Sequence, residues 1–188
     1  MTKQIAIFAS GAGSNAKKII EHFKFSNEIK VALIVCNKPT AGVCTIAEEN
    51  NIPLLLIEKK KFQEDGYANE LKQQHINWIV LAGFLWKVPS VLVHAFSNHI
   101  INIHPALLPN YGGKGMYGHY VHEAVIAAGE KQSGITIHLV DELYDHGKIL
   151  FQATCEIDKT DTADSLAAKI HQLEHAHFPA VIKKLLSE

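Results

Sequence analysis

Asn102 and His104 are two polar residues in the otherwise apolar run 100–104. If this run is a strand, their i, i+2 spacing points both side chains to the same face. An asparagine amide can donate a hydrogen bond to a developing oxyanion, and an imidazole can transfer a proton near neutral pH. The pair is therefore a candidate for oxyanion stabilisation and proton transfer at the carboxyl end of a strand, where ligands of open α/β sheets gather.

A turn rich in carboxylates is the second candidate. Asp141, Glu142 and Asp145 lie within the seven residues 141–147, directly after a run that alternates apolar and polar residues. One of these carboxylates can orient a histidine across a cleft or hold it in its charged form. The alternative is a polar turn whose charges are solvated. The spacing alone does not distinguish the three carboxylates.

The loop Gly11-Ala12-Gly13-Ser14-Asn15 lies between an apolar run and a helical pattern. Glycines let the backbone approach a ligand, and a helix N-terminus offers free N–H groups and positive potential. The spacing is neither a full GxGxxG nor a P-loop, and Asn37 stands near the place where a dinucleotide-binding fold usually has an acidic residue. The loop favours a monophosphate cradle at Gly13, Ser14 and Asn15, with a plain turn as the alternative.

The composition restricts how an anion can be held. All 18 basic residues are lysine, and the sequence contains no arginine. An anionic substrate must therefore be bound by lysine, histidine, hydroxyl or backbone N–H groups, because bidentate arginine contacts are not available. The net charge of −1 provides no basic surface for DNA or RNA, so a small polar ligand is expected and a nucleic-acid partner is not.

Cysteine, histidine and hydropathy patterns set further expectations. The three cysteines lack CxxC spacing, and the sequence shows neither a signal peptide nor an apolar stretch of the ~18 residues that a membrane span requires. His171 and His175 have the i, i+4 spacing of metal ligands, but no third ligand is evident. We expect a soluble, cytoplasmic protein with reduced thiols, no membrane partner and no metal.

Short apolar runs alternate with longer amphipathic segments, which predicts an α/β protein with a Rossmann-like, mostly parallel twisted sheet and helices on both faces. A late antiparallel strand and a long C-terminal helix complete it, and Pro179 should kink or break that helix. Strands are expected at Gln4–Ala9, Lys30–Cys36, Pro53–Ile57, Trp78–Leu81, Ile100–Ile103, Gly134–Val140 and Ile149–Ile157. Helices are expected at Ala16–Phe23, Gly42–Asn50, Phe62–Gln74, Pro89–Phe96, Tyr120–Ala128 and Thr162–Leu185.

Four motifs together carry a resemblance: GAGSN, LAGFLWKVP, NIHPALLP and HLVDELYDHG. Over essentially its whole length the chain resembles the folate-dependent formyltransferase superfamily, and its GxGSN loop is similar to the glycinamide ribonucleotide branch. The resemblance implies transfer of the formyl group of 10-formyltetrahydrofolate to the amine of glycinamide ribonucleotide in purine biosynthesis. It implies a single domain over residues 1–188, with a nucleotide-binding half of about 1–100 and a catalytic and folate-binding half of about 100–188, in a monomer or homodimer.

The resemblance also implies roles for particular residues, carried over position by position. The catalytic residues would be Asn102, His104 and Asp145, with His138 close by in a supporting role. The phosphate and ribose of the nucleotide would be bound by Gly13, Ser14, Asn15, His171 and Glu174. The folate would be bound by Leu85, Trp86, Lys87, Val88, Asp141, Glu142, Leu143 and Tyr144. The Leu108–Pro109 peptide bond would be cis.

Three segments depart from the pattern of the family. Residues 62–67 read FQEDGY, where members often carry an arginine that contacts the folate. His171 occupies a position that is often lysine or glutamine. The loop Asn110–Gly118 is longer than usual and contains four glycines. Lys114 in this loop could supply charge for the phosphate or for the folate glutamate tail, or the loop could simply be mobile.

Three alternative functions remain open. Within the superfamily, a chain of this kind could formylate methionyl-tRNA or hydrolyse 10-formyltetrahydrofolate, although those enzymes usually carry a further domain at one end. Outside it, the chain could be a non-catalytic nucleotide-binding module of Rossmann type. Such a module would be expected to end its second strand with an acidic residue, and Asn37 stands near that position instead.

Overall fold

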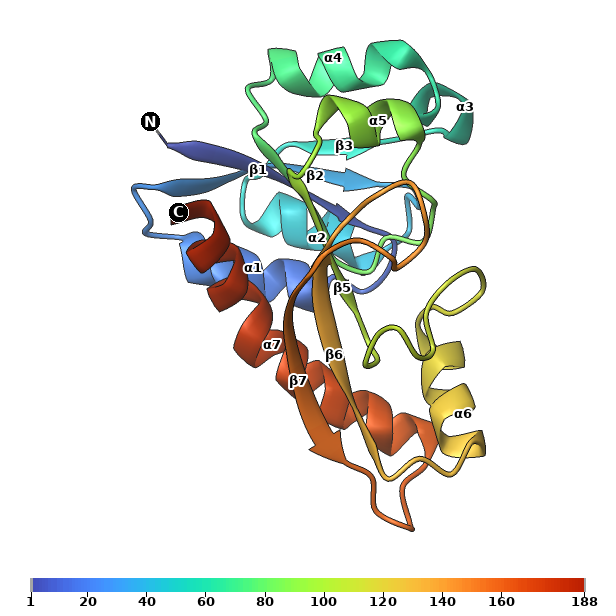
Figure 1. Cartoon of the computed structure of the whole chain (residues 1–188). Coiled ribbons are helices and arrows are strands. Elements are labelled where there is room, and N and C mark those ends of the chain that lie inside the picture. Colours follow the sequence, from blue (N-terminus) through green and yellow to red (C-terminus); the bar gives the residue numbers. More distant parts are fainter. Residues whose placement is uncertain (1, 188) are drawn as a thin grey trace.

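The computed structural model describes residues 2–187, apart from the side chain of Asp65. One seven-stranded sheet runs through it in the order β3-β2-β1-β4-β5-β6-β7 (Figure 1). The first five strands in sequence pair in parallel, and β6 and β7 are antiparallel to their neighbours, which confirms the predicted late antiparallel pairing. The strands are β1 (Lys3–Ala9), β2 (Ile29–Cys36), β3 (Leu54–Leu56), β4 (Trp78–Leu81), β5 (Ile100–His104), β6 (Gln132–Leu139) and β7 (Ile149–Glu156).

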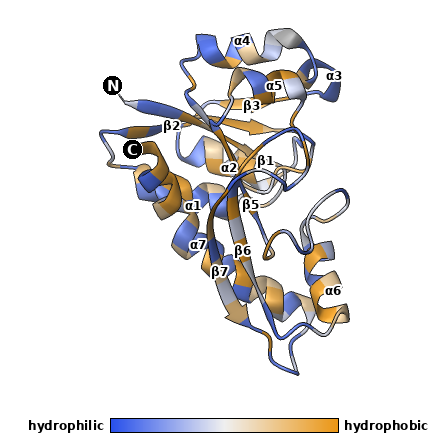
Figure 2. Cartoon of the chain, viewed as in Figure 1, coloured by the Kyte–Doolittle hydropathy of each residue, from blue (hydrophilic) through white to orange (hydrophobic). Residues whose placement is uncertain are grey.

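Helices cover both faces of the sheet, as predicted (Figure 1). The central strands are buried on both sides and are strongly apolar (Figure 2). Side chains of β1 alternate between the two faces, so Ile5 and Ile7 pack with α1, α2, α6 and α7, whereas Ala6 and Phe8 pack with α3, α4 and α5. The helices are α1 (Ser14–Phe23), α2 (Gly42–Glu49), α3 (Lys59–Phe62), α4 (Asp65–Gln73), α5 (Ser90–Ala95), α6 (His119–Ala127) and α7 (Ala163–Ser187).

The single helix predicted at Phe62–Gln74 is wrong, because α3 ends at Phe62 and α4 begins at Asp65. Glu64 between them has an extended backbone with ψ of 144°. In one continuous helix, residues five apart point about 140° away from each other. The break instead lets Phe62 and Tyr67 both enter the core, with ring centroids 5.5 Å apart.

Pro179 does not break the C-terminal helix, which continues to Ser187. The proline removes one backbone hydrogen bond, but α7 buries a residue at every fourth position on both sides of it. This stripe packs against α1, α6, β6 and β7 and holds the helix together across the proline. The stripe consists of Leu166, Ile170, Glu174, Phe178, Ile182 and Leu186.

The direction of the chain reverses beside β1. After β1 the chain moves outward through β2 and β3, and it then returns to the other side of β1 as β4. The loops that follow β1 and β4 therefore diverge, which leaves a crevice at the carboxyl ends of these strands. The backbone N–H of Ser10 donates to the carbonyl of Gly83 at 3.0 Å and joins the two loops at the base of the crevice.

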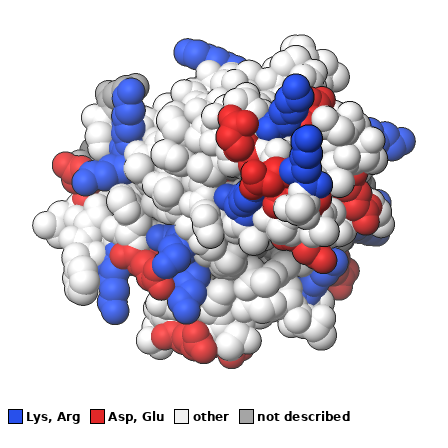
Figure 3. Space-filling view, turned by 90° about the horizontal axis from the view of Figure 1, so that it is seen from below, with Lys and Arg blue, Asp and Glu red and all other residues white. Residues whose placement is uncertain are grey.

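Two surface properties bear on possible partners. On the face shown in Figure 3, lysine and acidic side chains are interspersed rather than gathered into a patch of one sign. Among residues 2–187, no helix is both long enough and apolar enough to cross a bilayer.

Candidate active site

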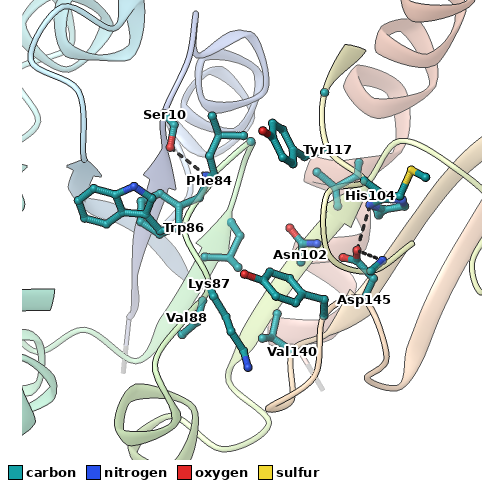
Figure 4. A pocket seen from close by; sticks show the side chains of 18 of the residues that line it. Ser10, Phe84, Trp86, Lys87, Val88, Asn102, His104, Tyr117, Val140 and Asp145 are labelled. Atoms are coloured by element: carbon teal, nitrogen blue, oxygen red, sulfur yellow. Dashed lines mark hydrogen bonds and ion pairs between the residues drawn. The ribbon is translucent and has the colours of Figure 1, made fainter. Parts of the chain in front are cut away.

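A cavity of about 580 Å³ opens along the carboxyl ends of β1, β4 and β5 (Figure 4). The loops after β1 and β4 line one side of this cavity, and the turn after β6 and the loop between β5 and α6 line the opposite side. The lining residues are Ser10, Gly11, Lys38, Leu81, Gly83–Val88, Asn102–Pro105, Gly113–Gly118, His138, Val140, Asp141 and Leu143–Asp145. All three predicted catalytic residues are among them, so Asp145 lies in the same cavity as Asn102 and His104, which are 43 and 41 positions before it in the sequence.

His104 is held by the loop that follows β5. Its Nε2–H donates to the carbonyl oxygen of Tyr111 at 2.8 Å, so in the neutral ring Nδ1 carries no proton. Nδ1 lies 3.6 Å from Oδ2 of Asp145, and the His104 side chain is only 4% exposed. Burial lowers the pKa of His104, and the nearby Asp145 carboxylate offsets only part of this effect. A neutral imidazole with an unprotonated Nδ1 facing the Asp145 side can accept a proton.

Asn102 is oriented by its partner across the sheet. The antiparallel register places Asn102 opposite His138 of β6. The Asn102 amide donates to Nε2 of His138 at 3.0 Å, while Nδ1 of His138 donates to the carbonyl of Leu139 at 2.8 Å. One amide hydrogen of Asn102 is used in this way, and the second remains able to donate to an oxyanion in the cavity. His138 thus orients Asn102 and lies beside the three predicted catalytic residues.

Asp145 lies against Gly113, His104 and His138. Its Oδ2 accepts a hydrogen bond from the backbone N–H of Gly113 at 2.9 Å, and its Oδ1 lies 3.7 Å from Nε2 of His138. Burial raises the pKa of Asp145, but His138 and His104 in their protonated forms and the Gly113 N–H lower it, and the pKa lies below its ordinary value overall. The residue also has φ of 52°, a left-handed conformation that is uncommon outside glycine. The carboxylate is therefore ionised beside a neutral His104.

The structure distinguishes the three carboxylates of this turn. Asp141 accepts hydrogen bonds from the backbone N–H of Leu143 and from Nδ1–H of His146, both at 2.8 Å. These two bonds stabilise the turn. Glu142 points to the surface, where its Oε1 lies 2.9 Å from Nε2 of His94. Asp145 is the carboxylate directed at His104. Of the predicted folate-binding residues in the turn, Asp141, Leu143 and Tyr144 line the cavity, and the structure does not bring Glu142 to it.

The other predicted folate-binding segment, Leu85–Val88, forms a wall of the cavity (Figure 4). Its backbone is fixed by Ser10, whose Oγ accepts the N–H of Leu85 at 3.0 Å. Trp86 packs against Phe62 with ring centroids 5.9 Å apart, so the FQEDGY segment supports this wall with aromatic rings. Lys87 places its Nζ 5.4 Å from the centre of the Tyr144 ring, and a cation thus stands at this end of the cavity.

The glycine loop after β1 forms the start of α1. Gly13 has φ of 81°, and a Cβ there would lie 2.9 Å from Cα of Val43. Glycine is therefore required for the close approach of α1 and α2. No described side chain caps the N-terminus of α1, so its first N–H groups have no side-chain partner. Binding of an anion by Gly13, Ser14 and Asn15 stays a prediction.

The predicted nucleotide-binding residues come together from opposite ends of the chain. Asn15 donates from Nδ2 to Oε2 of Glu174 at 2.8 Å, and Nδ1 of His171 donates to the same oxygen at 2.9 Å. Glu174 lies in the buried stripe of α7 and is 5% exposed, so this carboxylate is fixed in place. The five residues lie outside the described lining of the cavity, which reaches Ser10 and Gly11 at that end.

Sequence reasoning missed several groups of the site. The carbonyl of Tyr111 bonds His104 and the N–H of Gly113 bonds Asp145, and residue types in a sequence do not reveal such backbone contacts. Lys38 and Phe84 also line the cavity, as does the glycine-rich loop through Lys114, Met116 and Tyr117. The one signal in the sequence is the glycine-rich composition of this loop, which predicts a mobile segment or, at Lys114, a source of charge.

Two further expectations concern a peptide bond and a metal. The Leu108–Pro109 peptide bond is cis, as predicted. Within residues 2–187, no three His, Cys, Asp or Glu side chains are arranged to hold a metal ion.

Comparison with known proteins identifies the family. The sequence pattern of the formyl transferase family matches residues 3–182, nearly the whole chain, and this chain belongs to that family. It is 40% identical over 190 residues to phosphoribosylglycinamide formyltransferase of Bacillus subtilis, covering 98% of this chain and 95% of that protein. It is 41% identical over 192 residues to the chloroplastic phosphoribosylglycinamide formyltransferase of Vigna unguiculata, covering 99% of this chain. The chain spans 62% of the length of that plant protein.

The fold is shared with solved structures. The crystal structure of phosphoribosylglycinamide formyltransferase from Bacillus halodurans superimposes with a TM-score of 0.90 at 37% sequence identity, covering 99% of this chain and 96% of that one. The mostly parallel sheet with its late antiparallel strands and long C-terminal helix is therefore the fold of this family.

Proposed function

We propose that this chain transfers the formyl group of 10-formyltetrahydrofolate to the amine of glycinamide ribonucleotide, a step of purine biosynthesis. The observation that carries the proposal is the convergence of Asn102, His104 and Asp145 in a cavity of a formyl transferase fold. The names of the relatives from Bacillus subtilis and Vigna unguiculata support the same substrates.

The two ends of the site suit the two substrates. The N-terminus of α1 offers N–H groups to a phosphate, and Glu174 beside it can accept hydrogen bonds from ribose hydroxyls. At the other end, the aromatic and aliphatic wall at 84–88 suits a flat pterin ring, and backbone groups there can bond its polar edge. Lys87 can attract the negative charge of the glutamate tail. The proposed catalytic residues line this same cavity, where the amine and the formyl group would meet.

The chemistry follows from the protonation states. The amine nitrogen attacks the formyl carbon, and the carbonyl oxygen becomes an oxyanion that the free N–H of Asn102 stabilises. The proton lost by the attacking nitrogen passes to Nδ1 of His104, directly or through water, and ionised Asp145 stabilises the imidazolium that forms. The bond from carbon to the folate nitrogen then breaks as that nitrogen takes the proton from His104. The products are the formylated nucleotide and tetrahydrofolate.

The proposed roles of Asn102 and His104 predict how much turnover is lost when either side chain is removed. Removing one oxyanion donor typically costs about 10²–10³ in turnover, and general acid–base help contributes roughly 10²–10⁴. We expect Asn102→Ala and His104→Ala each to lower kcat at least about a hundredfold, with cooperative unfolding retained. Near-normal turnover in both variants would reject this assignment of the site.

The deciding experiment measures release of tetrahydrofolate with and without glycinamide ribonucleotide. The proposal requires release that depends on the nucleotide and yields its formylated form. Release at the same rate without the nucleotide would instead identify a hydrolase. Thermal stabilisation by NAD, but by neither glycinamide ribonucleotide nor a folate analogue, would identify a nucleotide-binding module.

A further inference from the structure

Tyr111 has a backbone conformation that bulky residues rarely adopt. Its φ of 55° lies in the left-handed region, where an aromatic side chain is strained. Strained residues persist only where the surrounding structure holds them, and they concentrate at functional sites. The carbonyl of Tyr111 accepts Nε2–H of His104 at 2.8 Å, so this conformation directs a backbone group at the proposed catalytic histidine.

The side chain of Tyr111 is held at both of its ends. Its ring is partly buried and packs against the core that α1 and α7 share with the sheet. At the outer end of the ring, Oη donates to Oε1 of Glu130 at 2.7 Å. Glu130 lies in the turn between α6 and β6, where its own backbone N–H donates to the carbonyl of Val125 at 3.4 Å. The bond to Glu130 raises the pKa of the Tyr111 hydroxyl, so the hydroxyl stays protonated and donates at neutral pH.

The backbone next to Tyr111 packs directly on the proposed catalytic residues. A Cβ on Gly112 would lie 2.5 Å from Cδ2 of Leu108 and 3.2 Å from Cβ of Asp145, so only glycine fits at this close approach. A rotation of the Tyr111 peptide would therefore move the backbone against Asp145 as well as away from His104. The anchored Tyr111 side chain opposes such a rotation.

The two acceptors beside His104 favour different neutral tautomers. A neutral imidazole carries one proton, either on Nε2 or on Nδ1. The Tyr111 carbonyl favours the proton on Nε2, whereas the Asp145 carboxylate, with Oδ2 3.6 Å from Nδ1, favours the proton on Nδ1. Because a hydrogen bond to a carboxylate is the stronger kind, the Nε2–H form requires a well-placed Tyr111 carbonyl. Only in that form can Nδ1 accept the proton of the attacking amine.

We infer that Glu130 and the side chain of Tyr111 are positioning residues, which hold the Tyr111 carbonyl at Nε2 of His104 and so keep the ring in its Nε2–H tautomer. Neither side chain is among the described residues that line the cavity, so both act through His104 rather than on a substrate. The effect on turnover rests on the proposed function. The effect on the tautomer is a property of the free protein and requires no substrate.

Steady-state rates of tetrahydrofolate release test the effect on turnover. Tyr111→Phe keeps the ring but removes the donor, and Glu130→Ala removes the acceptor. Glu130→Gln keeps a side-chain oxygen that can accept the same bond. Glu156→Ala is the matched control, because Glu156 also accepts an exposed side-chain hydrogen bond near the start of β6, from Gln132, but that bond joins β6 to β7.

We expect Tyr111→Phe and Glu130→Ala each to lower kcat about three- to tenfold, as the loss of one exposed hydrogen bond to a charged group implies. KM for both substrates should stay within about twofold, since neither residue lines the cavity. Glu130→Gln should recover most of kcat, and Glu156→Ala should retain it. Unchanged kcat in both Tyr111→Phe and Glu130→Ala, or equal losses in Glu130→Ala and Glu130→Gln, would overturn the inference.

The variant with both Tyr111→Phe and Glu130→Ala tests whether the two residues act through one bond. Each single change already breaks that bond, so the double variant should lose no more kcat than either single variant. Losses that multiply in the double variant would show that the residues act separately, and would overturn their pairing as one device.

Nitrogen NMR of the substrate-free protein with labelled histidine rings measures the tautomer itself. At pH 8 the ring of His104 is neutral, because burial lowers its pKa, and comparison with His104→Ala assigns its signals. Protonated and unprotonated ring nitrogens resonate far apart. The wild-type protein and Glu156→Ala should show a protonated Nε2 and an unprotonated Nδ1, whereas in Tyr111→Phe and Glu130→Ala the two signals should move towards each other as the tautomers exchange.

Unchanged His104 signals in both variants would overturn the inference, whatever the turnover. The proposed function fails in a different way, which is the absence of nucleotide-dependent tetrahydrofolate release by the wild-type protein. In that case a shift of the His104 signals in the two variants would still support the positioning role of Tyr111 and Glu130.

Discussion

The imidazole of His104 is fixed by the backbone of Tyr111, which accepts its Nε2–H at 2.8 Å and so directs Nδ1 towards Asp145. This one contact determines which nitrogen is free to accept a proton. It also links the geometry of His104 and Asp145 to the loop 111–118, because Gly113 of the same loop donates to Asp145. One short segment therefore bonds both His104 and Asp145.

Asp145→Asn should lower kcat by about 10²–10⁴ while leaving KM for both substrates largely unchanged. The amide keeps the shape of the side chain but cannot stabilise the imidazolium of His104. Steady-state rates of tetrahydrofolate release measure the effect. The control is Glu142→Gln, whose carboxylate pairs with His94 on the surface, and it should keep turnover within about twofold. Equal losses in the two variants would contradict the distinction drawn between these carboxylates.

His138→Ala should lower kcat by roughly ten- to a hundredfold, because Asn102 loses the acceptor that orients its amide. As a positioning residue, His138 should affect kcat much more than KM. A glutamine at this position can still accept a hydrogen bond, so His138→Gln should recover part of the loss. If the alanine and glutamine variants have the same kcat, His138 does not act through Asn102.

Gly13→Ala should destabilise the protein and weaken nucleotide binding. The new Cβ would lie 2.9 Å from Val43, and the left-handed backbone adds strain of order 1–3 kcal/mol. Gly129→Ala is a matched control, since Gly129 also has positive φ, 69°, but its Cβ would meet no described atom within 4 Å. Thermal denaturation should give a lower Tm for Gly13→Ala than for Gly129→Ala. The reverse order would show that the contact between α1 and α2 is not tight.

Buried His122 should make the folded state sensitive to acid. Its pKa is about 4 when folded and about 6.5 when unfolded, so the unfolded chain binds more protons between these values. The free energy of unfolding should therefore fall as pH decreases from about 6.5 to 4, by up to about 1.4 kcal/mol per pH unit from this residue. His122→Gln should show a shallower fall in denaturant titrations across this window. A wild-type slope in that variant would exclude His122 as the source.

The sequence determined the parts of the structure that depend on local pattern. Alternating apolar runs and amphipathic segments predicted the α/β sheet, and the i, i+2 spacing of Asn102 and His104 placed both on one face. The glycines and the following helical pattern predicted the open helix N-terminus at Gly13. These features arise from periodicity and backbone sterics within a few residues, so neighbouring residue types are sufficient to specify them.

Tertiary structure decided what depends on distant contacts. Burial on both sides of Pro179 kept α7 intact, and the packing of Phe62 and Tyr67 into one core divided the helix predicted there. The sequence does not distinguish the three carboxylates of the turn after β6. In the structure Asp141 bonds Leu143 and His146, whereas Asp145 faces His104. Asn15 and Glu174 are 159 residues apart, and their contact exists because the sheet order brings α1 against α7. Such pairings depend on how the whole chain packs, which no local pattern records.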